Sequence, residues 1–444
     1  MNVSKFYFIG LTLCFLQLNL FAQNPILPGK GVCDPQIRIY HNKAYLYATH
    51  DSAAKSKTFV MNDWWIWSSS DLVNWKYEAR LKPEDTYYKK ATNQCWATDA
   101  ISRNGKYYLY FSRGPKEIGV VESDSPIGPW KDPVQKPLIA LNFTPTEARD
   151  PGILQLQDGT SYIVFGVWDF YIARLNPDMV SLAETPKKIT LDKKDGPYGP
   201  GKTDDKPFLH QRGNKFYLSW GCYYAMADDL YGPYNYEGSI ITKERTDSLF
   251  QKKLTYDRHG SFFKLHNQWY FACNDQSVPG SDKHFRNSVI SYVHYKKNGE
   301  IAPIYLSQTG VGQYDASLIE AEDYFSASKV NQQENTDGGF SVSAIQNGTY
   351  LYYPKVRNLG KNAKVFLRIS SLGGVNCTLN IRENNSKGKL LGKYKLRLKT
   401  AEMEKTISFD LKNSTGDKNI CLQFKGDPNS LKLDWFSFDK KPGF

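Results

Sequence analysis

The sequence predicts an all-β protein in which a five-bladed β-propeller is followed by a β-sandwich of the jelly-roll type. Three observations lead to this fold class: a short pattern that occurs five times, short alternating strands after it, and no long helical period. The five copies of the pattern cover 34–49, 97–112, 150–166, 205–221 and 259–274. All-β units that repeat about every 50 residues are typical of propeller blades.

One tyrosine coincides in every copy when the apolar runs that end the copies are aligned. Each tyrosine follows a turn such as RNGK or QDGT, and Asn-Gly-type turns between alternating strands are a strong hairpin signal. The tyrosines recur at intervals of 53 to 63 residues. They are Tyr45, Tyr108, Tyr162, Tyr217 and Tyr270. Five hairpins in step indicate a repeat architecture rather than chance similarity.

The start of the chain is typical of a secretory signal peptide. Within residues 1–22, Lys5 precedes an apolar stretch that ends in Leu-Phe-Ala before Gln23. This stretch is too short for a stable membrane span, and no later apolar run is long enough to cross a bilayer. We therefore expect a secreted or periplasmic protein with no transmembrane segment.

Charge and cysteine usage limit the partners. The net charge of +12 comes from lysines spread through loops, without a compact basic run, so we expect no nucleic-acid partner. Six cysteines follow the signal segment, and none has metal-ligand spacing. Buried free thiols and a single disulfide are both compatible with an exported chain. We expect a monomer.

The chain divides into three parts. After the signal peptide (1–22), NPILPGKG leads into the propeller (23–310), and a long loop, KKDGPYGPGKTDDKP, precedes the fourth blade. The linker SQTGVGQYDAS then leads to the sandwich (318–440), where short alternating strands such as KVFLRISSL and CTLNIREN follow one another without helices.

Acidic residues recur at the starts of the repeats, where the innermost strands of a propeller line its central channel. Asp34, Asp150, Asp205 and His259 stand eleven or twelve residues before the aligned tyrosines, and Asp99 of the second repeat stands nine before. Asp at a strand start also forms turns. Three carboxylates meeting at one channel mouth repel each other, however, and paired carboxylates with separated pKa values are what glycoside hydrolysis requires.

Several segments resemble glycoside hydrolase family 43, most closely its arabinoxylan arabinofuranohydrolase-like members, which are five-bladed propellers. They are GVCDPQIRIYHNKAYLYATHD, CWATDAISRNGKYYLYFS, ARDPGILQLQDGTSYIVFG, DRHGSFFKLHNQWYF and FRNSVISYVHYKKNGEIAPI. The resemblance covers about 24–310 and implies an inverting mechanism. It makes Asp34 the general base and Asp150 the carboxylate that orients the acid and raises its pKa. At the acid position, before a small residue in the family pattern, this chain has Asp205 in place of glutamate.

Other residues are candidates for the sugar site. We expect Asp99 in the channel and Arg286 on a sugar hydroxyl or on the base carboxylate, because a guanidinium binds carboxylates in a bidentate manner. The resemblance places His259 near the channel centre, beside a calcium ion or a water, although a hydrogen-bonded core histidine is the alternative. Trp64, Trp96 and Trp168 would form walls of the site unless they pack in the core. Asp204 and Glu147 are reserve candidates for the acid.

The C-terminal segments LIEAEDYFSAS and LKLDWFSFDK resemble a family 6 carbohydrate-binding module over about 318–440. The resemblance implies a structural calcium ion held by Glu320, Glu322 and Asp439, since oxygen ligands suit that hard cation. The chain departs from the family's sugar cleft: Asp434 replaces an asparagine, and FSVSAI lacks an expected aromatic residue. The module then binds elsewhere or only supports the propeller.

These observations favour a secreted, exo-acting, inverting glycosidase without an organic cofactor that acts on plant polysaccharide, foremost as an α-L-arabinofuranosidase. A β-xylosidase or β-galactofuranosidase would use the same carboxylates. A glycan-binding protein that has lost turnover is the alternative from another class, because the glutamate is missing.

Overall fold

The computed structural model describes residues 23–192, 195–196, 199–200, 203–336, 338–439 and 442. The expected signal peptide, 1–22, lies outside the described residues. Strands dominate the described part of the chain. Its helices are α1 (Ser248–Gln251) and three 3₁₀ turns (Pro83–Asp85, Lys243–Arg245 and Ala321–Asp323), so no described helix has the length and apolarity that crossing a membrane requires.

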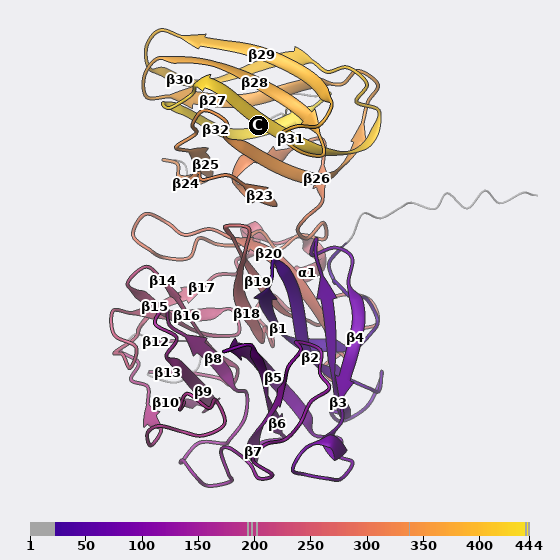
Figure 1. Cartoon of the computed structure of the whole chain (residues 1–444), viewed down its shortest axis with the longest axis vertical. Helices are drawn as coiled ribbons and strands as arrows, with labels where there is room; N and C mark the ends of the chain where they lie inside the picture. Colours follow the sequence, from indigo (N-terminus) through magenta and orange to yellow (C-terminus); the bar gives the residue numbers. More distant parts are fainter. Residues whose placement is uncertain are drawn as a thin grey trace, which may run out of the picture.

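The N-terminal part forms five antiparallel sheets in chain order, as predicted (Figure 1). Blade one contains β1 (Val32–Tyr40), β2 (Lys43–Asp51), β3 (Met61–Ser69) and β4 (Lys76–Leu81), and blade two contains β5 (Cys95–Arg103), β6 (Lys106–Arg113) and β7 (Glu117–Ser123). Blade three contains β8 (Gly152–Gln155), β9 (Ser161–Val167), β10 (Asp169–Arg174) and β11 (Lys187–Lys188), and blade four contains β14 (Pro207–Arg212), β15 (Lys215–Trp220), β16 (Tyr223–Ala227) and β17 (Asn235–Ser239). Blade five contains β18 (Gly260–Leu265), β19 (Gln268–Asp275) and β20 (Asn287–Val293). A two-stranded ribbon of β12 (Asp195–Gly196) and β13 (Gly199–Pro200) lies in the long loop before blade four.

The five aligned tyrosines lie on the second strand of each blade. In every blade the tyrosine is paired with a residue near the far end of the innermost strand, as Tyr45 is with Arg38 and Tyr270 is with Phe263. The innermost strands are β1, β5, β8, β14 and β18, and neighbours in this order contact one another, with β18 returning to β1. The repeat in the sequence is therefore the blade hairpin, and its register sets where the inner strands begin.

The ring is closed by the start of the chain, which attaches to blade five. The backbone N–H of Gln23 donates to the carbonyl of Gln308 (2.9 Å). The buried Asn24 amide donates to the carbonyls of Ile290 (2.9 Å) and Ser307 (2.8 Å) and accepts from the N–H of Ile290 (2.8 Å). These bonds join segments that are nearly 300 residues apart, so they hold the first and last blades together.

The C-terminal part is a sandwich of two six-stranded sheets around one apolar core, as predicted. One sheet contains β21 (Tyr314–Asp315), β23 (Ser326–Ala327), β26 (Tyr350–Leu359), β28 (Val375–Glu383), β29 (Leu390–Leu398) and β31 (Gly416–Asp427); the other contains β22 (Ile319–Glu320), β24 (Asn331–Glu334), β25 (Phe340–Ser343), β27 (Lys364–Ser371), β30 (Glu402–Asp410) and β32 (Leu431–Phe438). The sandwich starts before residue 318, because β21 already pairs with β26.

The sandwich, orange to yellow in Figure 1, lies on one side of the propeller. The hydroxyls of Tyr292 in blade five and Tyr314 in the sandwich are hydrogen-bonded at 2.8 Å. Lys355 pairs with Asp71 at 2.9 Å at the edge of the same contact. Phe325 of the sandwich packs into an apolar cluster of blades one and five. The two domains thus share a mixed polar and apolar junction.

The six cysteines from Cys33 to Cys421 are all free and buried. The structure therefore resolves the alternative left by the sequence in favour of buried thiols. Burial raises the pKa of Cys33, which lies next to Asp34, well above its ordinary value. A neutral thiol is the form that an apolar surrounding favours.

Candidate active site

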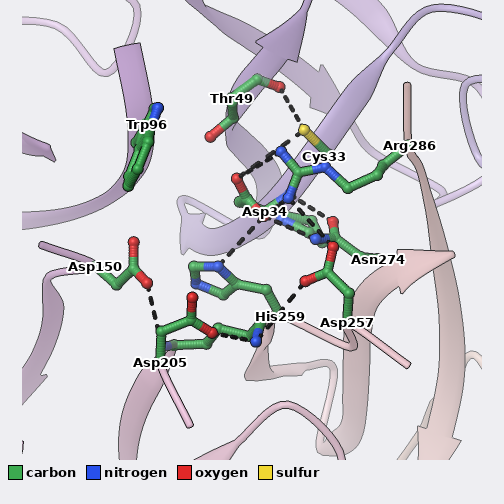
Figure 2. Close-up of polar contacts among 12 residues, drawn as sticks. Cys33, Asp34, Thr49, Trp96, Asp150, Asp205, Asp257, His259, Asn274 and Arg286 are labelled. Carbon is green, nitrogen blue, oxygen red and sulfur yellow. Dashed lines mark hydrogen bonds and ion pairs between the residues drawn. The ribbon is translucent and has the colours of Figure 1, made fainter. Parts of the chain in front are cut away.

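A cavity of about 470 Å³ opens where the inner strands of the propeller begin. Its volume falls within the range of small-molecule sites. Its charged lining includes Lys206. It also includes Asp34, Asp150, Asp205, Asp257, His259 and Arg286, which are labelled in Figure 2. The three aspartates predicted from equivalent repeat positions therefore meet in one cavity.

Four of the charged residues that line the cavity have an unusual backbone conformation. Asp34, Asp150, Lys206 and Asp257 have positive φ angles of 48°, 55°, 72° and 45°. Non-glycine residues rarely adopt this left-handed region, and each such residue carries about 1–3 kcal/mol of strain. Each precedes or interrupts an inner strand; at Asp34 the register of β1 against β2 shifts by a bulge. Such a bend turns a side chain out of the strand alternation and towards the channel.

Asp34 is buried and held from three directions. Its carboxylate accepts hydrogen bonds from Arg286 (2.9 Å) and from the amide of Asn274 (2.7 Å), and His259 Nδ1 lies 3.3 Å away. Its N–H donates to Asn274 Oδ1 (2.6 Å). Burial alone would raise the pKa of Asp34, but Arg286 and His259 outweigh it and hold the pKa well below its ordinary range. Asp34 is therefore an anion in a fixed orientation.

Arg286 binds the carboxylate of Asp34, which is one of the two contacts expected for it. Its Nε and Nη2 bind both oxygens of Asp51 at 3.0 Å each, and its Nη1 reaches Asp34. The guanidinium also lies over the ring of Phe59, 5.0 Å from its centroid. This buried arginine is fully engaged by the protein, so it orients Asp34 and holds it ionised.

His259 lies between the carboxylates and is buried. Beyond its contact with Asp34, its Nε2 is 3.5 Å from the amide of Gln36. Burial lowers the pKa of His259, but the carboxylates of Asp34 and Asp150 outweigh it and raise the pKa above its ordinary value. A protonated His259 would place a cation at the centre of the aspartate cluster.

Asp150 has a different environment from Asp34. Its N–H donates to the hydroxyl of Ser112 (2.9 Å), and its Oδ2 accepts the backbone N–H of Lys206 (3.2 Å). Burial and the nearby charge of Asp205 raise the pKa of Asp150 to about 6. Asp150 therefore takes up a proton about two pH units above an ordinary aspartate.

Asp205, at the position expected for the acid, is bound by two cations. Lys206 Nζ pairs with Oδ1, and Arg149 Nη2 lies 3.5 Å from Oδ2. Burial would raise the pKa of Asp205, but Lys206 and Arg149 outweigh it, so the pKa is lowered. The carboxyl that the sequence assigns to proton donation is thus held as an anion.

Sequence reasoning missed Lys206 and Asp257. The Lys206 ammonium is buried and also pairs with Asp204 (2.7 Å) and lies 3.8 Å from Asp257. Asp257 accepts from the amide of Gln276 (3.0 Å). One signal was present for Lys206, because it stands where the family pattern has a small residue. For Asp257, the signal was its position two residues before His259.

The three tryptophans have different surroundings. Trp96 lines the cavity, and the guanidinium of Arg149 lies 5.5 Å from its ring centroid. Trp64 is 1% exposed and donates its Nε1–H to the carbonyl of Trp96 (2.6 Å), so it supports the wall from behind instead of forming it. Trp168 is half exposed and does not line the cavity; its N–H donates to the carbonyl of Asp204 (2.9 Å). Of the three tryptophans expected to line the cavity, Trp96 is the one that does.

Asp99 lies deeper in the channel than expected and is a structural residue. It is fully buried, pairs with Arg38 and accepts the N–H of Ile153 (2.7 Å), which links blades one, two and three. Its offset of nine residues from the aligned tyrosine, against eleven or twelve for the others, explains the difference. A shorter offset places a residue farther along the inner strand and away from the mouth.

Of the two reserve candidates for the acid, Asp204 and Glu147, one lines the cavity and the other does not. Asp204 lines the cavity, but its carboxylate is paired with Lys206. The Glu147 side chain is 48% exposed, pairs with Arg149 Nε (3.1 Å) and does not line the cavity. Both carboxylates are therefore engaged by cations.

The structure does not gather the predicted calcium ligands Glu320, Glu322 and Asp439 into a cluster of three carboxylates, and calcium binding stays a prediction. No three or more His, Cys, Asp or Glu residues among the described ones are arranged to hold a metal ion. The carboxylate of Asp439 is occupied by the backbone N–H groups of Gly360 (3.0 Å) and Lys364 (3.3 Å). Glu322 is buried, and burial together with Asp323 and Glu320 raises its pKa well above the ordinary value, so it favours the neutral acid.

Comparisons with known proteins agree with this architecture. Residues 22–301 match the model described as glycosyl hydrolases family 43, and residues 320–440 match the carbohydrate binding module of family 6. The chain is 26% identical over 483 residues to an arabinoxylan arabinofuranohydrolase of Paenibacillus polymyxa, over 95% of this chain and 75% of that protein. It is 26% identical over 332 residues to a xylosidase/arabinosidase of Bacteroides ovatus, over 63% of this chain and 96% of that protein.

Among solved structures, the fold is similar to that of a family 43 arabinoxylan arabinofuranohydrolase from Bacillus subtilis. The TM-score is 0.56 at 20% identity, over 95% of this chain and 98% of that chain. At this identity the likeness concerns the fold, and it extends through both domains.

Proposed function

Because the chain belongs to glycoside hydrolase family 43, with a family 6 carbohydrate-binding module after it, we propose that it is an exported, inverting, exo-acting α-L-arabinofuranosidase of plant polysaccharide. The observation that carries the proposal is the meeting of Asp34, Asp150 and Asp205 in one cavity under different electrostatic control. Glycoside hydrolysis by inversion needs one carboxylate as base and one carboxyl as acid, with room for a water molecule between them.

Asp34 is proposed as the general base. Its low proton affinity keeps it ionised across the neutral range, and Arg286 and Asn274 fix its direction. In this role it accepts a proton from a water molecule as the water oxygen attacks the anomeric carbon. A positioned base of this kind contributes about 10²–10⁴-fold to the rate.

The acid function is proposed to reside in the Asp150–Asp205 pair. Two interacting carboxyls that share a cavity bind their protons in steps that belong to the pair. With Asp205 held as an anion, the raised pKa of Asp150, about 6, keeps one proton in the site at mildly acidic pH. This proton would go to the glycosidic oxygen as its bond to the anomeric carbon breaks. Trp96, which lines the same cavity, is proposed as the wall against which the sugar ring packs.

The names of two relatives support the proposed sugar preference. The arabinoxylan arabinofuranohydrolase name favours an arabinosyl substrate, and the xylosidase/arabinosidase name supports a β-xylosidase as the second candidate. Both sugars are pentoses and require the same base and acid. A glycan-binding protein without turnover is the remaining alternative, since Asp205 replaces a glutamate.

A substrate screen tests the proposal. The purified protein would be offered arabinosyl, xylosyl and galactofuranosyl aryl glycosides and arabinoxylan, and the anomer first released would be identified by proton NMR. We expect release of arabinose with inverted configuration at the anomeric carbon. Retention of configuration would exclude the mechanism, and sugar binding by calorimetry without hydrolysis of any substrate would identify a binding protein.

A further inference from the structure

Each oxygen of Asp205 lies within ion-pair distance of a cation, whereas one oxygen of Asp150 has no cation or hydrogen-bond donor among the described residues. Lys206 Nζ pairs with Asp205 Oδ1 and Arg149 Nη2 approaches Oδ2 at 3.5 Å. Asp150 Oδ2 accepts the backbone N–H of Lys206, but Oδ1 receives no hydrogen bond from any described residue and points away from Asp205 in Figure 2. A general acid needs an oxygen that carries a proton and faces the substrate. Of these two carboxyls, only Asp150 offers one.

Lys206 is buried and held in place by three carboxylates. Its side chain is 8% exposed, and its ammonium contacts Asp204, Asp205 and Asp257 at once. Its φ of 72° is a conformation that glycine adopts without strain and lysine rarely adopts. A lysine in this strained, buried place removes one carboxylate from acid chemistry while its own backbone N–H supports the neighbouring carboxyl.

We propose that Asp150, and not Asp205, protonates the leaving oxygen, and that Lys206 is the positioning residue that enforces this division. The inference rests on the proposed hydrolysis. In the step, the proton of Asp150 moves to the glycosidic oxygen, which takes the electron pair of the breaking bond to the anomeric carbon. The water oxygen forms the new bond to that carbon, and its proton goes to Asp34. Exchange of protons with solvent then restores both carboxyls.

The charges around the Asp150–Asp205 pair come from five segments. They are Arg149 before β8, Asp204 and Lys206 before β14, Asp257 and His259 before β18, Asp34 in β1, and Arg286 before β20. Because cations surround Asp205 and the anion of Asp205 faces Asp150, the arrangement keeps the proton on Asp150. Loss of Lys206 removes a cation and thus favours protonation of the pair.

Leaving-group dependence separates an acid from any other role. Wild type, Asp150→Asn and Asp205→Asn would be assayed with dinitrophenyl and phenyl glycosides of the pentose that the wild type cleaves, since only the phenyl glycoside needs protonation of its leaving group. We expect Asp150→Asn to lose about 10²–10⁴-fold with the phenyl glycoside and less than about 10-fold with the dinitrophenyl one. Asp205→Asn should lose similar factors on both. Asp228→Asn, an exposed aspartate of blade four, is the matched control.

The pH profile of kcat/KM tests Lys206. Wild-type activity should fall as the pH rises through about 6, the pKa of Asp150. In Lys206→Gly this basic limb should move to higher pH, and Lys206→Arg should restore it; a purely structural lysine would lower activity equally at every pH. Asp205→Asn should keep a basic limb, moved to lower pH, and Asp150→Asn should lose it.

The outcomes distinguish the two proposals. A leaving-group-selective loss in Asp205→Asn or Asp257→Asn, with none in Asp150→Asn, overturns the assignment of the acid while leaving hydrolysis intact. A wild-type protein that cleaves none of the aryl glycosides overturns the proposed function, and the assignment with it.

Discussion

The propeller and the sandwich treat charge in opposite ways. The propeller buries Asp34, Asp150, Lys206, His259 and Arg286 around its cavity; all but Asp150 form ion pairs, and Asp150 accepts a backbone N–H. The sandwich encloses an apolar core, and among its described residues Glu322 is the one buried side chain that is a carboxyl, lysine, arginine or histidine. Apolar burial is sufficient to hold a sheet pair together. Buried charge is concentrated where chemistry needs it, and it carries backbone strain with it.

The largest contrast is expected from a matched pair of Asp→Asn changes. Asp34→Asn removes the proposed base and should lower kcat on an aryl pentoside by about 10²–10⁴-fold. Asp434→Asn in the sandwich, where the carboxylate binds Asn335 (3.0 Å) and Arg368 (3.4 Å), should leave that kcat within about 2-fold, because the residue is far from the reacting bond. Steady-state assays decide, with circular dichroism to show that both variants fold. Equal losses would remove the functional division between the domains.

A matched pair of Arg→Met changes compares the contribution of buried and surface ion pairs to the free energy of unfolding. Arg286→Met leaves Asp34, Asp51 and Asp257 without their buried cation and should destabilise the propeller by about 3–5 kcal/mol. Arg368→Met in the sandwich breaks partly exposed ion pairs with Glu404 and Asp434 and should cost less than about 1 kcal/mol. Urea unfolding, followed separately for the two domains, gives both values. A small effect at Arg286 would mean that solvent reaches the cluster.

The domains should also respond to pH with opposite signs. The pKa of Asp34 is lowered on folding, so its contribution is present above the ordinary value of 3.8 and is lost as the pH falls below it. The pKa of Glu322 is raised, so the folded state binds the extra proton and stability falls as the pH rises above 4.5, by up to about 1.4 kcal/mol per pH unit. Glu322→Gln should flatten this slope. Thermal unfolding at pH 4 to 7 measures it, and an unchanged slope would show that Glu322 is ionised in the folded domain.

The smallest effect is expected at the junction. Lys355 and Asp71 join the two domains by a pair of which each side chain is about one-third exposed. Lys355→Ala should therefore change stability by no more than about 1 kcal/mol and leave hydrolysis unchanged. Calorimetry of the variant and of Lys418→Ala, whose pair with Glu383 lies within the sandwich, provides the comparison. A large separation of the two unfolding transitions in Lys355→Ala alone would assign the coupling of the domains to this pair.

The sequence was sufficient for the fold because the repeat is periodic. Five aligned tyrosines imply five hairpins, and equal offsets from them imply inner strands that begin at one mouth. The meeting of Asp34, Asp150 and Asp205 follows from this periodicity. The position of Asp99 could have been corrected by the same rule, because its offset is shorter.

The rest of the site is not periodic. Asp257 and Lys206 reach the cavity through left-handed backbone at loop ends, and no repeat spacing encodes a positive φ. Trp64 and Trp96 look alike in sequence, yet one supports the other through a hydrogen bond to a carbonyl. The protonation of Asp150 depends on which cations face Asp205, and residue type at one position does not determine that.

Closure of the ring through Gln23 and Asn24 has a consequence for maturation. The two residues follow directly after the expected cleavage site, yet the backbone of both and the side chain of Asn24 bind blade five and the segment after it. A signal peptidase that cut two residues later would remove the fastening between the first and last blades. A purification tag fused directly to Gln23 would have to leave through the same tight contact, so affinity handles belong at the other end of the chain.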